Sequence, residues 1–234
     1  MADLVYGRRP VREALRGRRE VLELWATERA VAAEPWLAEA KPKPAADRDL
    51  AERAGTRDHQ GVVAAVEPYR YADAYELARA ERPLLAVLDR VTDPRNLGAV
   101  CRSADGAGAT GVVVPAHGSA VVTAAVARAS AGAVEHLPVA VVTNLARYLE
   151  EVKGADLWVF GAAAEPAATP MWEADLSGGA ALVLGSEGRG LRPLVRRTCD
   201  LLVSIPLLGG VESLNVSVAA ALLLYEARRQ RALS

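Results

Sequence analysis

The chain has 234 residues, of which 51% are hydrophobic and 24% are charged, and its formal net charge at pH 7 is −1. These proportions exclude a disordered chain, and no apolar run approaches the roughly 18 residues of a membrane-spanning helix. Residues 1–12 lack the apolar segment of a secretory signal, and the two cysteines, Cys101 and Cys199, have no metal-ligand spacing. We therefore expect a cytoplasmic protein with free thiols.

The first part of the chain predicts a small α/β unit. Hydrophobic periodicity indicates helices over 10–16, 35–40 and 47–54 and strands over 21–26 and 61–66. Prolines 42 and 44 separate the second and third helices. The tyrosine-rich, polar stretch 69–82 after Pro68 predicts a linker with some helical content.

Arginines gather in three clusters, whereas lysine occurs at only three positions. A single cluster of this kind is more simply a solvated helix face. Three of them together favour a polyanionic partner, since arginine is the better bidentate ligand for phosphate. The clusters are Arg8, Arg9, Arg12, Arg16, Arg18 and Arg19; Arg189, Arg192, Arg196 and Arg197; and Arg228, Arg229 and Arg231.

From residue 84 onward, short apolar strands alternate with helices. The expected strands are 84–88, 111–114, 137–142, 156–160, 180–184 and 201–205, and the expected helices include 97–106, 121–129 and 145–152. This alternation predicts an α/β fold with a mainly parallel sheet that is covered on both faces. The final helix, 214–231, is apolar nearly all round between Val216 and Leu224, which indicates a subunit interface on the side that the sheet cannot cover.

Three polar segments each follow a predicted strand: 89–102, 185–190 and 206–215. In an open parallel sheet the carboxyl ends of strands form the ligand-binding edge, so we expect the three segments to converge there. Glycines 185, 188 and 190 allow the backbone to approach a ligand closely, and glycines 209 and 210 allow the third segment to wrap around one.

Single residues in these segments have plain structural interpretations as well. Asn96 is either a helix cap or a residue at the mouth of the sheet, and either Ser213 or Asn215 is the cap of the last helix. Arg102 lies among small residues and is expected to be partly sheltered, which requires an anionic partner. Glu187 is either a solvated turn residue or a ligand-binding one.

Other motifs carry little weight. Gly106-Ala-Gly-Ala-Thr-Gly matches the G-x-G-x-x-G spacing of dinucleotide-binding proteins, but it ends a helix and leads into a strand, the reverse of the required order. The histidines at 59, 117 and 136 are scattered and predict no zinc site. A glycine-lysine phosphate loop is missing from the sequence, which argues against ATP hydrolysis.

The three polar segments together resemble the three motifs of the SpoU (TrmH) family of RNA ribose 2′-O-methyltransferases, a branch of the SPOUT superfamily. The matching residues are Asp93-Pro-Arg-Asn-Leu-Gly with Arg102, Leu184-Gly-Ser-Glu-Gly-Arg-Gly, and Ile205-Pro-Leu with Ser213-Leu-Asn-Val-Ser. One departure is Leu207, where the family usually has Met. The N-terminal Val5-Tyr-Gly-Arg and His59-Gln-Gly-Val are similar to the small RNA-binding domain, akin to ribosomal protein L30e, of some members.

This resemblance implies a deep trefoil knot, a homodimer formed through the C-terminal domain, S-adenosylmethionine as methyl donor, and no metal. It implies an L30e-like substrate-binding domain over 1–68, a linker over 69–82 and a catalytic domain over 83–234. The implied cofactor-binding residues are Gly161, Gly185, Ile205, Leu207 and Leu214. Those implied for catalysis or ribose positioning are Asn96, Arg102, Glu187, Ser213 and Asn215.

Among members of the family, the likeness points to transfer of a methyl group to the ribose of a guanosine in the P loop of 23S rRNA. A guanosine of tRNA and an rRNA adenosine at an antibiotic site stay open as substrates. A non-catalytic RNA-binding relative is a further alternative, and a nicotinamide-dependent dehydrogenase is the third class.

Overall fold

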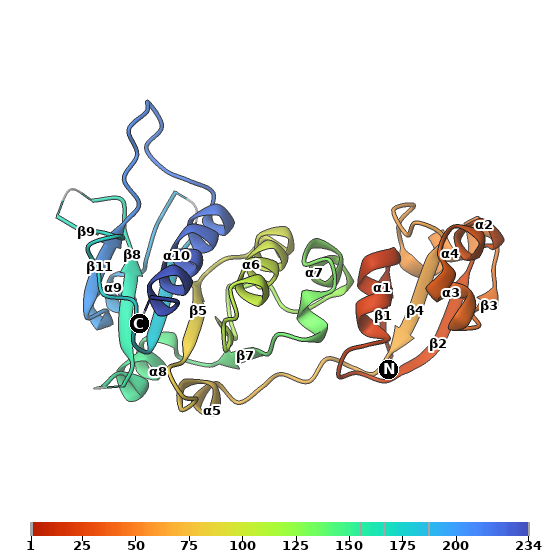
Figure 1. Ribbon diagram of the computed structural model, residues 1–234, viewed down its shortest axis with the longest axis horizontal. Coiled ribbons are helices and arrows are strands. Elements are labelled where there is room, and N and C mark those ends of the chain that lie inside the picture. Colours follow the sequence, from red (N-terminus) through yellow and green to blue (C-terminus); the bar gives the residue numbers. More distant parts are fainter. Residues whose placement is uncertain (1, 155, 166, 187, 234) are drawn as a thin grey trace.

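The computed structural model describes residues 2–154, 156–165, 167–186 and 188–233, and within them the chain forms two β-sheets from different parts of the sequence. Figure 1 shows the small sheet on the right and the large sheet on the left. The expected α/β class is confirmed. Across the described ranges no helix is long and apolar enough to cross a membrane.

The small sheet is built around β4 (Val62–Val66), in which all five residues are buried. The antiparallel partners of β4 are β1 (Asp3–Tyr6) and β2 (Val21–Ala26), and β3 (Lys43–Pro44) pairs in parallel with β2. A continuous apolar strand suits the centre of a sheet because both of its faces are covered. The accompanying helices are α1 (Arg8–Ala14), α2 (Glu28–Ala33), α3 (Pro35–Glu39) and α4 (Asp47–Ala54). We refer to these elements as the small-sheet unit.

The large sheet has the spatial order β7-β6-β5-β10-β8-β11-β9, and its described pairings are all parallel. Its strands are β5 (Leu84–Asp89), β6 (Gly111–Pro115), β7 (Val139–Val142), β8 (Trp158–Ala162), β9 (Thr169–Pro170), β10 (Ala180–Gly185) and β11 (Leu201–Ser204). In this sheet β10 lies between β5 and β8, so the carboxyl ends of these neighbouring strands meet at one edge. The strand order leaves the trefoil knot untested, and the knot stays a prediction.

Helices cover both faces of the large sheet, as the continuous apolar strands predict. Successive residues of β5 alternate between two cores: Leu84, Ala86 and Leu88 belong to one, and Leu85 and Val87 to the other. The helices of this part are α5 (Ala74–Ala78), α6 (Pro94–Gly106), α7 (Ala124–Ala129), η1 (Ala133–Glu135), α8 (Leu145–Val152), α9 (Pro193–Thr198) and α10 (Val216–Arg231). We refer to them, with the sheet, as the large-sheet unit.

The predicted strands and helices have counterparts in the structure, most with ends shifted by one to three residues. Strand 21–26 and helices 47–54 and 145–152 have the predicted limits. The elements that the sequence patterns missed are β1, β3, β9, α2, η1 and α9, each of two to six residues. Segments of that length contain too few repeats for a period of 2.0 or 3.6 to stand out.

The last helix, α10, has one buried and one exposed apolar face in the single chain. Leu223, Leu224 and Ala227 are buried, and α10 packs against α6 and β10. On the other side Val218, Leu222 and Tyr225 are 46%, 39% and 53% exposed. Because these three positions are spaced four and three residues apart, they form one stripe along the helix. The sheet therefore covers only part of this helix, and the subunit interface stays a prediction.

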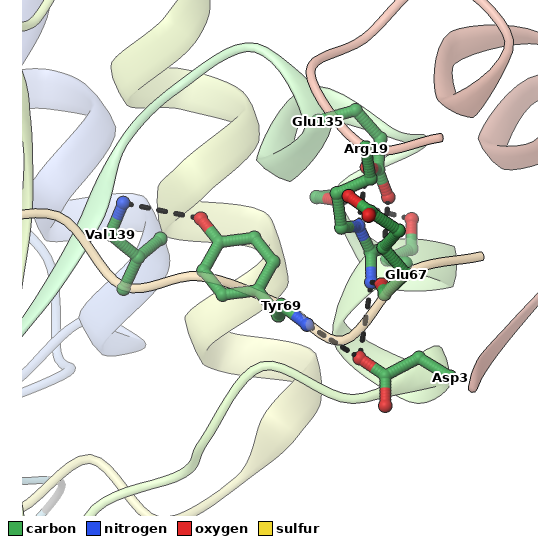
Figure 2. Close-up of polar contacts among 8 residues, drawn as sticks. Asp3, Arg19, Glu67, Tyr69, Glu135 and Val139 are labelled. Carbon is green, nitrogen blue, oxygen red and sulfur yellow. Dashed lines mark hydrogen bonds and ion pairs between the residues drawn. The ribbon is translucent and has the colours of Figure 1, made fainter. Parts of the chain in front are cut away.

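A buried ion pair joins the two units (Figure 2). The guanidinium of Arg19, which follows α1, donates to both carboxylate oxygens of Glu135 in η1, at 2.9 and 2.5 Å. The Glu135 side chain is fully buried and that of Arg19 is 8% exposed. A Cβ at Gly17 would lie 2.6 Å from the Cβ of Glu135, so this glycine allows the close approach. The assignment of Arg19 to an RNA-facing cluster is therefore wrong, because its charge is used inside the protein.

Other contacts surround this ion pair and fix the path of the linker. Asp3 accepts hydrogen bonds from Arg19 (3.1 Å) and from the backbone N–H of Tyr69 (2.9 Å), and the Tyr69 hydroxyl accepts one from the N–H of Val139 at 3.3 Å (Figure 2). Nearby, His136 contacts Glu13 at 2.9 Å. The two units are thus joined by several polar contacts as well as by the covalent chain.

Candidate active site

The first and third polar loops meet through two asparagine side chains. The Nδ2 of Asn215 donates to the Oδ1 of Asn96 at 3.1 Å. Asn215 is also the N-cap of α10, where its Oδ1 accepts from the backbone N–H of Ser217 at 2.9 Å. The cap at the start of α6 is Asp93, whose carboxylate accepts from the N–H of Arg95 at 2.8 Å. Because Asp93 fills the capping role, Asn96 is left to bind the third loop.

The first and second loops are joined by a buried carboxylate. Asp89, at the end of β5, is completely buried and accepts hydrogen bonds from the backbone N–H and the Nε of Arg192, at 2.8 and 2.6 Å. Sequence reasoning missed this pair, because Arg192 was grouped with arginines expected to face a polyanion. The signal that could have found it is an aspartate closing an otherwise apolar strand, since a buried carboxylate requires a donor.

The second loop turns back sharply on the end of β10. The N–H of Gly190 donates to the carbonyl of Ser186 at 2.9 Å, and a Cβ at position 185 would overlap the backbone of Gly190 and Leu191. Only glycine at 185 permits this approach without displacing the loop. Glu187, which the resemblance implies for the site, lies outside the described residues.

A cavity of about 640 Å³ lies between the second and third loops. Its floor is formed by the ends of β8, β10 and β11, and small apolar side chains, including Ala162, Leu184 and Val203, line much of it. Of the site residues implied by the resemblance, those that line it are Gly185, Ile205, Leu207, Ser213, Leu214 and Asn215; Gly188 and Gly190 line it as well. We call this cavity the edge pocket. In Figure 1 the loop between β11 and α10 extends above the large sheet.

Three other predicted site residues stand apart from the edge pocket. Gly161 belongs to β8 and is buried; a Cβ there would lie 2.8 Å from the sulfur of Cys199 and 2.9 Å from Leu191, so packing accounts for this glycine. Asn96 contacts the pocket-lining Asn215 without lining the pocket itself. Arg102 is exposed on α6, and the expectation that neighbouring small residues shelter it is wrong, because they face the core whereas Arg102 does not.

The titratable groups near the site argue against a cysteine nucleophile. Burial raises the pKa of Cys101 to about 12 and that of Cys199 to about 11, so both thiols are neutral at physiological pH. Hydrogen bonds from the backbone and side chain of Arg95 lower the pKa of Asp93, which keeps this helix cap ionised. Within the described ranges, no group of three or more His, Cys, Asp or Glu side chains is arranged to hold a metal ion.

Comparison with known proteins identifies the family. A model described as the SpoU rRNA methylase family matches residues 83–225, and one described as RNA 2′-O ribose methyltransferase substrate binding matches residues 4–72. The chain belongs to the SpoU rRNA methylase family. It is accordingly an RNA methyltransferase that uses S-adenosylmethionine.

Individual relatives match over most of their length. YacO from Bacillus subtilis, named as a TrmH family tRNA/rRNA methyltransferase, is 42% identical over 98% of this chain and 96% of its own. The 23S rRNA (guanosine-2′-O-)-methyltransferase RlmB of Ralstonia nicotianae is 50% identical over 80% of this chain and 76% of its own. The SpoU methyltransferase AviRb from Streptomyces viridochromogenes, solved in complex with the cofactor AdoMet, superposes with a TM-score of 0.82 at 31% identity, covering 99% of this chain and 91% of that chain.

Proposed function

We propose that this protein transfers a methyl group from S-adenosylmethionine to the ribose 2′-hydroxyl of a guanosine in the P loop of 23S rRNA. The observation that carries the proposal is the meeting of the three loops at one edge of the large sheet, where Asn215 joins the edge pocket to Asn96. The name of the Ralstonia relative, half identical in the matched region, supports guanosine of 23S rRNA as the target.

The edge pocket fits the cofactor in size and in the character of its walls. Its volume of about 640 Å³ lies within the range of small-molecule sites, and its walls combine apolar side chains with accessible backbone. In the proposal Ile205, Leu207 and Leu214 hold the apolar parts of the cofactor, and Gly185 lets the backbone approach it. Gly161 supports this site from β8 by permitting the packing of Leu191 and Cys199 beneath it.

When bound, S-adenosylmethionine supplies a methyl group already activated by the positive sulfonium, so the main task of the protein is alignment. We assign to Asn96 and Asn215 the positioning of the ribose at the mouth of the pocket, with Ser213 beside them. The resemblance also assigns Glu187 to this group. The mutual hydrogen bond of the two asparagines makes their amides a preorganised pair rather than two independent side chains.

Arg102 is proposed to act on the hydroxyl of the RNA. A guanidinium stays protonated in proteins, so Arg102 is poorly suited to remove a proton itself. We assign to it the stabilisation of negative charge that develops on the ribose oxygen, through contact with the oxygen or its neighbouring phosphate. Because Arg102 does not line the edge pocket in a single chain, this role requires bound RNA or a second subunit to complete the site.

The proposal divides the chain into an L30e-like RNA-binding domain (1–68), a linker (69–82) and a catalytic domain (83–234), and places the protein in the cytoplasm, where rRNA is modified.

The proposal also includes a homodimer formed through α10. The exposed stripe of Val218, Leu222 and Tyr225 supports a second copy as the occupant of that face, because it is apolar and lies on the side of the helix opposite its buried face. Leu222→Asp should shift the protein from dimer to monomer in light scattering, whereas Arg228→Glu, which changes an exposed residue of α10 outside the stripe, should not.

Labelled methyl transfer tests the function directly. The purified protein is incubated with labelled S-adenosylmethionine and either protein-free 23S rRNA or bulk tRNA, and the product is mapped by mass spectrometry. The proposal expects one 2′-O-methylguanosine in the P loop. Transfer to a tRNA guanosine, which the name of YacO leaves open, or to an rRNA adenosine would reject the substrate assignment. Binding of RNA without transfer to any RNA would reject catalysis.

A further inference from the structure

A second cavity, of about 340 Å³, lies in the small-sheet unit where α2, α4 and the turn before β4 come together. The side chains that characterise it are Arg8, Arg29, Asp47, Arg57, His59 and Gln60. We call this cavity the arginine pocket. It is formed entirely within the small-sheet unit and is separate from the edge pocket of the large sheet.

His59 places a buried hydrogen-bond donor in the wall of the arginine pocket. Its side chain is 1% exposed, and its Nδ1 accepts the backbone N–H of Gly61 at 3.1 Å. In the neutral ring the proton is therefore on Nε2. That atom is buried and has no hydrogen-bond partner among the described residues; the nearest carboxylate oxygen, of Asp47, is 3.8 Å away. A buried donor of this kind indicates an acceptor that comes from outside the chain.

The charges around the pocket define the chemistry of that acceptor. Arg29 and Arg57 are exposed and form no ion pair with any described residue. Arg8 forms an ion pair with Glu34, with 3.1 Å between the Nη1 of Arg8 and the Oε1 of Glu34. Asp47 is the one acid among the described lining residues, and its side chain is 81% exposed. Three guanidinium groups against one solvated carboxylate favour an anion. The one aromatic ring in the described lining is the imidazole of His59, which is 1% exposed and so presents no open face on which a base could stack.

Gln60 connects this pocket to the large-sheet unit. Its Oε1 accepts hydrogen bonds from the backbone N–H of Arg8 and from the Nη1 of Arg128 in α7, both at 3.0 Å. A ligand held in the arginine pocket is therefore held at a fixed position relative to α7 and, through it, to the large sheet.

We propose that the arginine pocket binds a phosphodiester group of the RNA substrate, with the Nε2–H of His59 and the guanidiniums of Arg29 and Arg57 donating to its oxygens. The inference rests on the proposed function, since it specifies where the small-sheet unit holds the RNA that the edge pocket methylates. Phosphate contacts of this type set the register and orientation of a nucleic acid without selecting its sequence.

The test measures binding of the full-length protein to a transcript of the 23S rRNA P-loop region over a series of salt concentrations. Arg29→Ala and Arg57→Ala should each weaken binding about tenfold, as expected when a charge-assisted hydrogen bond is lost. Each should also lower the slope of log K against log salt by about one, because one phosphate contact is removed. The matched control is Arg48→Ala, which removes an exposed arginine of α4 that does not line the pocket.

His59→Asn removes the proposed hydrogen-bond donor but can keep the hydrogen bond that His59 makes with the backbone of Gly61. The amide oxygen of asparagine can replace Nδ1 as acceptor for Gly61, whereas the Nε2 donor is lost. We expect weaker RNA binding with an unchanged affinity for S-adenosylmethionine. Should this variant fail to fold, the exposed Arg29 and Arg57 carry the test by themselves.

The outcomes distinguish this proposal from the proposed function. If Arg29→Ala and Arg57→Ala both bind RNA with the affinity and salt slope of Arg48→Ala, the arginine pocket does not bind phosphate. This result would overturn the proposal whatever the wild type methylates. Weaker binding with an unchanged salt slope would also overturn it, because the occupant would then be a base rather than a phosphate. If the variants bind RNA as expected but the wild type transfers no methyl group, the proposed function fails and the pocket stands.

Discussion

The edge pocket and the arginine pocket differ in what lines them. The edge pocket is lined mainly by alanine, leucine, isoleucine and valine side chains and by backbone, together with Ser186, Glu212 and Ser213, and asparagines lie at its mouth. The arginine pocket is walled by charged side chains and a buried histidine donor. An apolar slot suits a small cofactor whose recognition depends on shape, whereas clustered guanidiniums suit phosphate.

This difference indicates a division of labour between the two units. In our two proposals the large-sheet unit holds the methyl donor and the small-sheet unit holds the RNA. Such a division works only if the distance between the two pockets is constant, since a misplacement of about 1 Å at a reacting centre can cost about a hundredfold in rate. The buried ion pair of Arg19 and Glu135 joins the two units (Figure 2), and we expect it to keep that distance constant.

The largest expected effect concerns the chemical role of the large-sheet edge. Arg102→Ala should lower methyl transfer by roughly 10²- to 10³-fold, the usual cost of losing one group that stabilises developing charge. Affinity for S-adenosylmethionine, measured by calorimetry, should be unchanged because Arg102 does not line the edge pocket. Arg147→Ala, which removes an exposed arginine on α8, serves as the control. Parallel loss of cofactor affinity and transfer would reject the assignment.

The second effect concerns the junction between the units. Arg19→Met leaves the buried carboxylate of Glu135 without its guanidinium, and breaking one side of a buried pair costs about 3–5 kcal/mol of folding stability. Urea denaturation measures this loss. The double variant Arg19→Met/Glu135→Leu should lose much less, because the carboxylate of Asp3, the remaining partner of Arg19, is 44% exposed and no fully buried charge is left unpaired.

Lys43→Ala is the control for the junction, since the exposed pair of Lys43 with Glu23 is worth only about 0–1 kcal/mol. If Arg19→Met costs no more than Lys43→Ala, the ion pair is not what joins the units. A junction variant that still binds RNA but methylates it poorly would indicate that RNA binding and methyl transfer depend on different units and that the junction aligns them.

A smaller effect concerns the shape of the edge pocket. Gly185→Ala places a methyl group against the backbone of Gly190 and Leu191, and overpacking of this kind costs about 1–3 kcal/mol. If the displaced loop is the one that holds the cofactor, S-adenosylmethionine affinity should fall by about 5- to 150-fold. Gly209→Ala, whose added carbon would meet no atom within 4 Å, should bind the cofactor normally. Equal affinities in the two variants would contradict the role of the second loop.

The effect that is smallest at physiological pH is on the pH dependence of stability, because both thiols are neutral there. Burial raises the pKa of Cys101 from 9.0 to about 12 and that of Cys199 from 9.0 to about 11. Because a raised pKa in the folded state disfavours the thiolate, the associated stability is complete below pH 9 and is lost as the pH rises towards 11 and 12. The Cys101→Ala/Cys199→Ala variant should show a shallower loss of thermal stability between pH 9 and 11. An identical loss in the variant would exclude the thiols as its cause.

Much of the fold was predictable because its signals are local. The apolar runs of β5, β10 and β11 and the polar loops that follow them are contiguous in the sequence, and they predicted the parallel sheet and its ligand-binding edge. Asn215 was expected as one of two candidate caps, and it is the cap of α10. The roles proposed for Gly161, Ile205 and Leu207 came from resemblance, since nothing in the spacing of these residues indicates a cofactor.

The arginines illustrate where sequence reasoning stops. By sequence alone Arg19 and Arg192 belong to clusters that favoured a polyanionic partner, Arg102 was expected to be partly sheltered, and nothing singled out Arg57. The structure separates them: Arg19 and Arg192 bind carboxylates 116 and 103 positions away, whereas Arg57 and Arg102 are exposed. A sequence pattern records the charge of a side chain but not which distant residue it meets.

The sequence by itself therefore determined the class of the sheet, the positions of the three loops and the family, because periodicity and short motifs depend on neighbours along the chain. Only the tertiary structure decided which polar groups are internally satisfied, as Asp89 and Glu135 are. It also decided which are not: among the described residues Arg29 and Arg57 form no ion pair, and the Nε2 of His59 has no hydrogen-bond partner. The physical reason is that the cost of burying a charge or a donor depends on the partner that folding brings to it, and that partner is set by three-dimensional packing.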